Sequence, residues 1–216
     1  MSVSSNAGRI GVFGRSGSGK STYTKRLIKA RKRVVIFDPL EEYDAKVRVR
    51  HVRRDSINDV IRAIAADYQG FRVSYVPPAG DEAEALSKLC WALLEAQEPF
   101  RAGDKRTPGL TLVVEEMNNS FPVHGGAENC RGFAEICSRG RHYGIEVIGV
   151  SQRIAEVATR FRNNCTETVI LAQKGKRDLD AAAELIGGDR QKVMALRNLD
   201  YLHEKNGELS SGKLRF

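Results

Sequence analysis

Residues 14–21 read Gly-Arg-Ser-Gly-Ser-Gly-Lys-Ser, which is the spacing G-x-x-x-x-G-K-[ST] of a phosphate-binding loop. Glycines there let the backbone approach phosphate oxygens closely and aim its N–H groups at them. Lys20 supplies a cation for the β- and γ-phosphates, and the Ser21 hydroxyl is suited to ligate Mg²⁺. We therefore predict a site for a nucleoside triphosphate with Mg²⁺. The residues predicted to bind the nucleotide are Gly14, Arg15, Ser16, Gly17, Ser18, Gly19, Lys20, Ser21 and Thr22.

The segments on either side of this loop have the patterns of a strand and a helix. Residues 9–13 form a short apolar run. Residues 22–32 carry apolar side chains at helical spacing and end in basic residues, which suit the negative pole of a helix. Strand, glycine loop and helix in this order are the context in which the motif binds phosphate. A flexible glycine–serine turn, the alternative, does not explain the flanking segments.

Strand-like and helix-like segments alternate along the rest of the chain. Further strands are predicted at residues 34–37, 47–52, 71–76, 110–114, 145–150, 168–172, 201–203 and 212–216. Further helices are predicted at residues 56–68, 81–97, 127–141 and 178–186. This alternation predicts a three-layer α/β/α fold of the P-loop NTPase kind, with a mostly parallel central sheet. We expect one domain over residues 9–216, after a short flexible lead of residues 1–8.

Composition is ordinary for a globular protein, because 41% of the 216 residues are hydrophobic and 29% are charged. No apolar run approaches the roughly 20 residues needed to span a bilayer, so we expect no integral membrane segment. The N-terminus lacks the basic and apolar regions of a secretion signal. The four cysteines form no C-x-x-C pair, which favours reduced thiols in a cytosolic compartment.

The net charge of +8 favours a polyanionic partner. Basic residues gather in several short clusters, each of which can also be an ordinary solvated surface. Because nucleotide binding and a basic surface occur together, the composition favours nucleic acid as the partner.

A pair of acids follows the apolar strand predicted at residues 110–114. A P-loop enzyme needs a carboxylate at the end of such a strand to hold Mg²⁺, and Glu115 is placed for that role. Glu116 is placed to act as general base on an attacking water. Two adjacent acids at a strand end therefore favour hydrolysis over simple nucleotide binding. The alternative is a pair of surface carboxylates.

The strand predicted at residues 145–150 is followed by Ser151, Gln152 and Arg153. In a parallel sheet its carboxyl end faces the same crevice as the P-loop. A glutamine there is able to bond both the γ-phosphate and the attacking water, so Gln152 is a candidate γ-phosphate sensor. The alternative is a polar residue at the start of a helix.

Four segments of the chain resemble the FtsK/HerA superfamily of DNA-pumping ATPases, and within it the small genome-packaging ATPases of membrane-containing viruses. They are the P-loop, the segment Asp38-Pro39-Leu40-Glu41-Glu42-Tyr43, the strand ending in Glu115-Glu116, and residues 140–153, which run from Gly140-Arg141-His142-Tyr143-Gly144-Ile145 to Ser151-Gln152-Arg153. The resemblance spans roughly residues 9–202. It implies a RecA/FtsK-like fold of the ASCE type and ATP as the nucleotide.

The resemblance also implies a homohexameric ring with ATP sites between subunits and double-stranded DNA in its pore. It implies an arginine delivered in trans to the triphosphate, for which Arg141 matches best and Arg160 and Arg162 are rivals. Asp38 and Glu42 are implied to lie near the nucleotide as supporting polar residues. Candidate DNA contacts are the loop 118–126 and the basic residues Lys174, Lys176 and Arg177.

The function that these patterns favour is an ATP-hydrolysing DNA translocase that packages a viral genome into a preformed capsid. Its partners would be double-stranded DNA and a capsid, portal or vertex protein, and its location the host cytoplasm or the virion. A related motor for DNA transfer or filamentous phage assembly is one alternative. A nucleotide or small-molecule kinase, or an NTP-dependent binding switch, is an alternative of a different class.

Overall fold

One sheet of nine strands forms the centre of the part of the chain that the computed structural model describes, residues 7–43 and 52–215. The strands are β1 (Arg9–Phe13), β2 (Val34–Phe37), β3 (Val52–Arg54), β4 (Arg72–Tyr75), β5 (Leu110–Val114), β6 (Ile145–Ser151), β7 (Glu167–Leu171), β8 (Asp200–Lys205) and β9 (Glu208–Lys213). Their order is β3-β4-β2-β5-β6-β1-β7-β8-β9. The pairs from β3 to β7 are parallel, and β8 and β9 add an antiparallel hairpin. The predicted mostly parallel sheet is confirmed.

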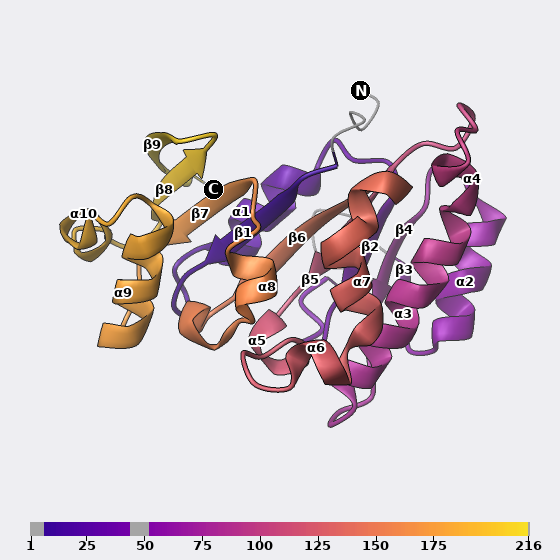
Figure 1. Cartoon of the computed structure of the whole chain (residues 1–216), viewed down its shortest axis with the longest axis horizontal. Coiled ribbons are helices and arrows are strands. Elements are labelled where there is room, and N and C mark those ends of the chain that lie inside the picture. The colour runs from indigo at the N-terminus through magenta and orange to yellow at the C-terminus, as the bar shows by residue number, and fades with distance from the viewer. Residues whose placement is uncertain (1–6, 44–51, 216) are drawn as a thin grey trace.

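Helices connect these strands and cover the sheet (Figure 1). They are α1 (Lys20–Ile28), α2 (Ile57–Ala66), α3 (Glu82–Ala96), α4 (Glu98–Arg101), α5 (Met117–Ser120), α6 (Gly126–Asn129), α7 (Arg131–Arg139), α8 (Thr159–Arg162), α9 (Lys176–Leu185) and α10 (Arg190–Met194). Two short 3₁₀ segments, η1 (Gly140–Tyr143) and η2 (Ile154–Glu156), stand before and after β6.

The central strands are apolar throughout because both of their faces are covered. All residues of β2 and β5 are buried, as expected for strands inside a parallel sheet. Alternate residues of β2 join two separate apolar clusters, with Val34 and Ile36 in one and Val35 and Phe37 in the other. Helix α1 packs into the first cluster, whereas α3 and α7 pack into the second. The three layers of the predicted fold are therefore present.

The parallel arrangement decides where the functional side chains lie. Strands β1, β5 and β6 run in the same direction, so their carboxyl ends meet at one edge of the sheet. The P-loop follows β1, the two glutamates follow β5, and Gln152 follows β6. Strand β6 lies between β1 and β5. The opposite edge holds the first residues of these strands and the 3₁₀ segment η1.

The boundaries of several elements differ from those predicted. The helix expected at residues 127–141 is divided into α6, α7 and η1. Gly132 lies against α3 so closely that a Cβ on it would come 2.2 Å from the Ser87 carbonyl oxygen. The strand predicted at residues 201–203 is part of β8, and the strand that follows it is β9 at Glu208–Lys213 rather than residues 212–216. Residues 1–6, and all but the last residue of the strand predicted at 47–52, lie outside the described residues.

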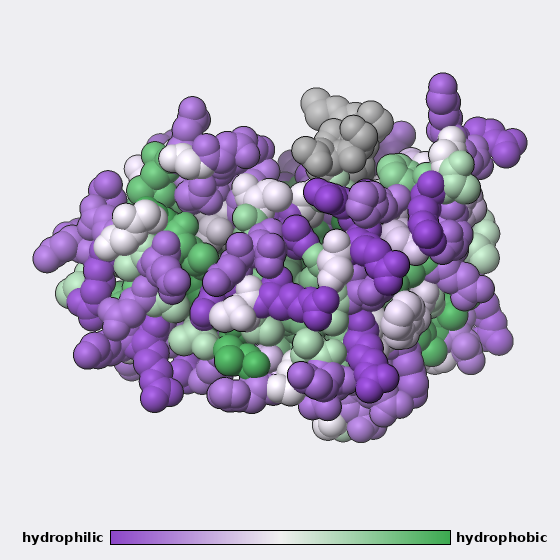
Figure 2. Space-filling view, viewed as in Figure 1, coloured by the Kyte–Doolittle hydropathy of each residue, from purple (hydrophilic) through white to green (hydrophobic). Residues whose placement is uncertain are grey.

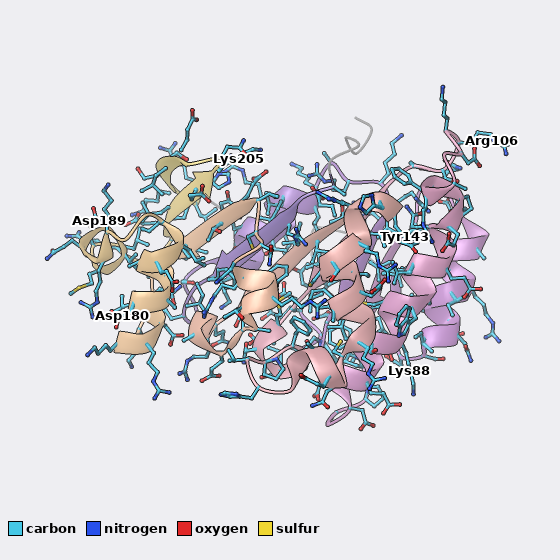
Figure 3. All side chains as sticks on the ribbon, in the orientation of Figure 1. Lys88, Arg106, Tyr143, Asp180, Asp189 and Lys205 are labelled. Carbon is cyan, nitrogen blue, oxygen red and sulfur yellow. The ribbon has the colours of Figure 1, made fainter. Side chains whose placement is uncertain are left out.

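The surface is mainly polar on the face that Figure 2 shows, with hydrophobic atoms in small separate areas. Charged side chains such as Arg106 and Asp180 project from the periphery (Figure 3). Among the described residues, no helix is both long and apolar enough to cross a bilayer.

Candidate nucleotide-binding and hydrolysis site

The P-loop is held between the ends of the two strands that flank β1. The Gly14 N–H donates to the Ser151 carbonyl oxygen at 3.2 Å, and the Arg15 N–H donates to that of Ala172 at 2.8 Å. These bonds join the loop to the carboxyl ends of β6 and β7. At Gly14 a Cβ would lie 2.5 Å from the Ser18 hydroxyl, so the loop closes on itself only because this residue is glycine.

The loop leads directly into α1, whose first turn is open to an anion. Gly19 precedes the helix with a φ of 106°, a conformation that side chains rarely adopt. No side chain caps this end, and its first turn contains no acidic residue. The first N–H groups of a helix lack partners within it and carry a partial positive charge. Phosphate oxygens are suitable partners for them.

Lys20 is the first residue of α1 and is buried. Its Nζ is 3.4 Å from the Arg15 carbonyl oxygen. Burial lowers its pKa, and the nearby carboxylates of Glu116 and Glu115 oppose that effect. The ammonium group therefore stands partly desolvated among acids, in a position where a triphosphate would provide a stronger counter-charge.

Glu115 is buried at the end of β5, and burial raises its pKa to about 8. The Tyr43 hydroxyl donates to its Oε1 at 2.6 Å, which opposes the effect of burial. A carboxylate held in an apolar environment gains most from a cation. The oxygens of Glu115 and of the Ser21 hydroxyl are donors of the kind that Mg²⁺ prefers, so these residues fit the metal that a P-loop site requires.

A turn after β2 brings further carboxylates to this place. Buried Asp38 accepts hydrogen bonds at 3.0 Å from the backbone N–H groups of Glu42 and Tyr43, and from the Ser74 hydroxyl. The turn presents Glu42 to α1, where the Ser21 hydroxyl donates to Glu42 Oε2 at 2.5 Å. Asp38 therefore positions both Glu42 and Tyr43. These bonds give a structural reason for the supporting role near the nucleotide that the resemblance implies for Asp38 and Glu42.

Glu116 adopts a backbone conformation that is uncommon for a residue with a side chain, with φ 45° and ψ 47°. Such strain persists only where surrounding structure holds it and is frequent at functional sites. The Gln152 amide nitrogen donates to Glu116 Oε1 at 2.7 Å. The candidate base and the candidate sensor, which are 36 residues apart, are thus brought together.

Other predicted residues lie farther from this centre. Lys174, Lys176 and Arg177 are exposed after β7, at the same edge of the sheet as the P-loop. Arg141 is exposed on η1, before β6, and hence at the opposite edge. The rivals are engaged within the chain: Arg160 donates to the Ser138 hydroxyl, and Arg162 donates to the Ile154 carbonyl oxygen.

Two residues of the site received no role in the sequence prediction. Tyr43 is the last residue of the segment 38–43. A tyrosine there could have indicated a contact with the site, because a buried tyrosine hydroxyl needs a polar partner. Gln173 lies directly after Ala172, to which the P-loop is bonded, and the two buried polar atoms of its amide have no partner in the described part of the chain. Nothing in the sequence pattern distinguishes Gln173 from an ordinary loop residue.

Comparison with known proteins agrees with this geometry. The family model described as the central domain of the helicase HerA matches residues 7–94. The genome packaging NTPase B204 of Sulfolobus turreted icosahedral virus 2, solved with AMPPCP, superimposes with a TM-score of 0.77 over 98% of this chain and 99% of that chain, at 16% identity. The chain has the fold of HerA/FtsK-type P-loop ATPases.

Other proteins with this fold are also similar. VirB4 of Thermoanaerobacter pseudethanolicus has a TM-score of 0.64 at 13% identity, over 96% of this chain and 89% of that chain. The comparison with curated protein sequences finds no match. B204 has been solved with AMPPCP and with ATP-gammaS, so in that protein this fold binds ATP analogues. The likeness to these structures shows that the chain has a P-loop NTPase fold.

Proposed function

We propose that this protein is an ATP-hydrolysing translocase that moves double-stranded DNA and packages a viral genome into a preformed capsid. The observation that carries the proposal is the contact between Gln152 and strained Glu116 at the sheet edge that holds Lys20. A nucleotide-binding switch or a small-molecule kinase has no need of a second acid prepared in this way. The likeness to the packaging NTPase B204 over nearly the whole chain supports the packaging role.

In the proposed reaction Lys20 and the N–H groups of the P-loop hold the phosphates. Glu116 accepts the proton of the attacking water, and Gln152 orients that water and the γ-phosphate. Ser21 and Glu115 would hold Mg²⁺, which neutralises negative charge on the phosphate oxygens when it is bound. Burial of the site strengthens each of these electrostatic contacts.

The motor assignment is tested by the rate of ATP hydrolysis with and without double-stranded DNA, alongside the mass of the protein in solution. We expect DNA to stimulate hydrolysis. We also expect the active species to be a ring of subunits, as in the proposed translocase. A kinase would need a phosphate acceptor instead. A binding switch would hydrolyse ATP slowly, and DNA would leave its rate unchanged.

We further propose that Arg141 completes the site of a neighbouring subunit. The seven residues of β6 separate it from the P-loop edge of its own chain, a distance of about 20 Å at roughly 3.3 Å per residue. An arginine there is therefore able to stabilise transition-state charge only in trans.

Arg141→Ala should abolish most ATP hydrolysis, and mixing it with Lys20→Ala subunits should restore part of the rate. In such mixtures an intact P-loop on one subunit meets an intact arginine on the next. The measurement is phosphate release across a series of mixing ratios. A mixture that stays as inactive as its components would point instead to Arg139, Arg160 or Arg162.

A further inference from the structure

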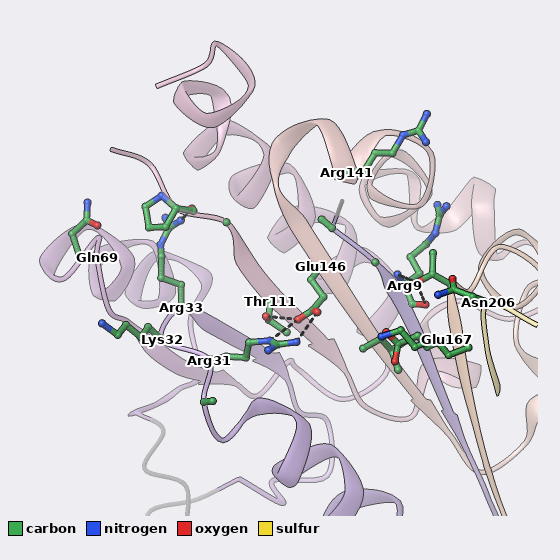
Figure 4. A pocket seen from close by; sticks show the side chains of 18 residues that line it. Arg9, Arg31, Lys32, Arg33, Gln69, Thr111, Arg141, Glu146, Glu167 and Asn206 are labelled. Atoms are coloured by element: carbon green, nitrogen blue, oxygen red, sulfur yellow. Dashed lines mark hydrogen bonds and ion pairs between the residues drawn. The ribbon is translucent and has the colours of Figure 1, made fainter. Parts of the chain in front are cut away.

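A cavity of about 920 Å³ opens at the edge of the sheet opposite the P-loop (Figure 4). Its walls come from the beginnings of β1, β5, β6 and β7, from the segment before β2, from η1, and from the end of β8 with the turn that follows it. The proposed hydrolysis reaction uses only one residue of this cavity, Arg141, and uses it for a neighbouring subunit.

The cavity is strongly basic. Six of its lining side chains are cations and two are carboxylates: Arg9, Arg31, Lys32, Arg33, Arg141 and Lys205, against Glu146 and Glu167. Both carboxylates are already engaged, because Arg31 forms a two-pronged pair with Glu146 and Lys205 bonds Glu167 at 2.7 Å. Apart from Arg141, which is assigned to the neighbouring subunit, the other three cations, Arg9, Lys32 and Arg33, have no carboxylate partner within the described residues.

Arg33 is the cation of this group with the greatest need of a counter-charge, because its side chain is buried and the residue is only 3% exposed. Its Nη1 donates to Gln97 and to the Pro108 carbonyl oxygen, whereas its buried Nε and Nη2 have no hydrogen-bond partner among the residues that the structure describes. The guanidinium lies over the rings of Tyr68 and Phe71, at 4.5 and 4.9 Å from their centroids. Burial lowers its pKa. A buried cation without a counter-charge is costly, and an anion in the adjoining cavity would offset that cost.

The polar lining indicates which anion would bind. Cations stand on both sides of the Arg31–Glu146 pair, with Lys32 and Arg33 on one side and Arg9 on the other (Figure 4). Such separated charges suit a row of phosphates better than a single one. No residue of the lining is aromatic, so the cavity offers no surface on which a base could stack. Arginine, lysine and amide side chains are typical of contacts to the nucleic-acid backbone.

We propose that this cavity binds backbone phosphates of double-stranded DNA. The inference rests on the proposed translocase function and assigns its DNA contact to the sheet edge opposite the P-loop of the same subunit. Strand β1 begins in the cavity with Arg9 and ends in the P-loop, and β6 runs from this edge to Gln152. The two strands connect the DNA contact to the hydrolysis site directly.

The test compares Lys32→Glu with Lys29→Glu. Both lysines are exposed in the segment that follows α1, and both changes alter the charge equally, but only Lys32 lines the cavity. Binding of a short blunt double-stranded DNA is measured by fluorescence anisotropy between about 50 and 200 mM salt. We expect Lys32→Glu to weaken binding severalfold and to reduce the slope of log Kd against log salt by about 0.9. Lys29→Glu should leave the slope unchanged.

Other results would overturn the inference. If Lys32→Glu and Lys29→Glu bind DNA equally, the cavity is not the contact, although the translocase function stands. Loss of binding only in the triple variant of Lys174, Lys176 and Arg177 would assign the contact to the other edge. A Lys32→Glu protein that loses affinity for ATP and retains it for DNA would make the cavity a nucleotide site. Failure of the unaltered protein to bind DNA would reject the proposed function itself.

Discussion

Glu116→Gln should reduce the rate of ATP hydrolysis by about 10²- to 10⁴-fold, which is the usual contribution of a general base, and should leave ATP affinity nearly unchanged. The amide keeps the shape of the side chain and its carbonyl oxygen still accepts from Gln152, so the strained backbone remains supported. Only the capacity to take a proton is lost. Phosphate release measures the rate, and a fluorescent ATP analogue measures binding.

A matched control for this change is Glu128→Gln, which removes the same charge from an exposed residue of α6. It should hydrolyse ATP at the rate of the unaltered protein. If Glu116→Gln also does so, Glu116 is not the base. A variant that neither hydrolyses nor binds ATP would show that Glu116 supports the pocket rather than the chemistry.

The parts of the site that follow one another in the chain were predictable. The P-loop is a local motif whose glycines, lysine and serine each have a physical reason to occur at their positions. The apolar runs of β2 and β5 indicated strands covered on both faces. Because parallel strands end at a common edge, Glu116 and Gln152 were expected in one crevice, and the structure places them in hydrogen-bond contact.

Contacts between distant segments were not predictable. Tyr43 and Glu115 are 72 residues apart, and their bond depends on β2 lying beside β5. The close packing of Gly132 against Ser87 of α3 joins segments 45 residues apart. The basic cavity is assembled from segments spread from Ala7 to Asn206, and no local pattern distinguished Lys32, which lines it, from Lys29, which does not.

The position of Arg33 was also not predictable from the sequence. In the sequence it belongs to a basic cluster of the kind that is usually solvated, yet in the structure it is buried and lies over two aromatic rings. Its neighbour Lys32 remains exposed. Tertiary packing, rather than local composition, decides which charge of such a cluster becomes part of a binding site.

Lys20→Ala should prevent ATP binding instead of slowing hydrolysis alone. Removal of one partner from a close charged contact costs about 2–5 kcal/mol, so the Kd for ATP should rise on the order of 10²-fold or more. Without nucleotide the variant should be no less stable than the unaltered protein, because burial already lowers the pKa of the Lys20 ammonium. Thermal unfolding without nucleotide and binding of a fluorescent ATP analogue provide the two measurements. Lys29→Ala, an exposed lysine at the end of the same helix, should bind ATP normally. Unchanged ATP affinity in Lys20→Ala would mean that residues 14–21 are not the phosphate site, and the proposed reaction would have no place to occur.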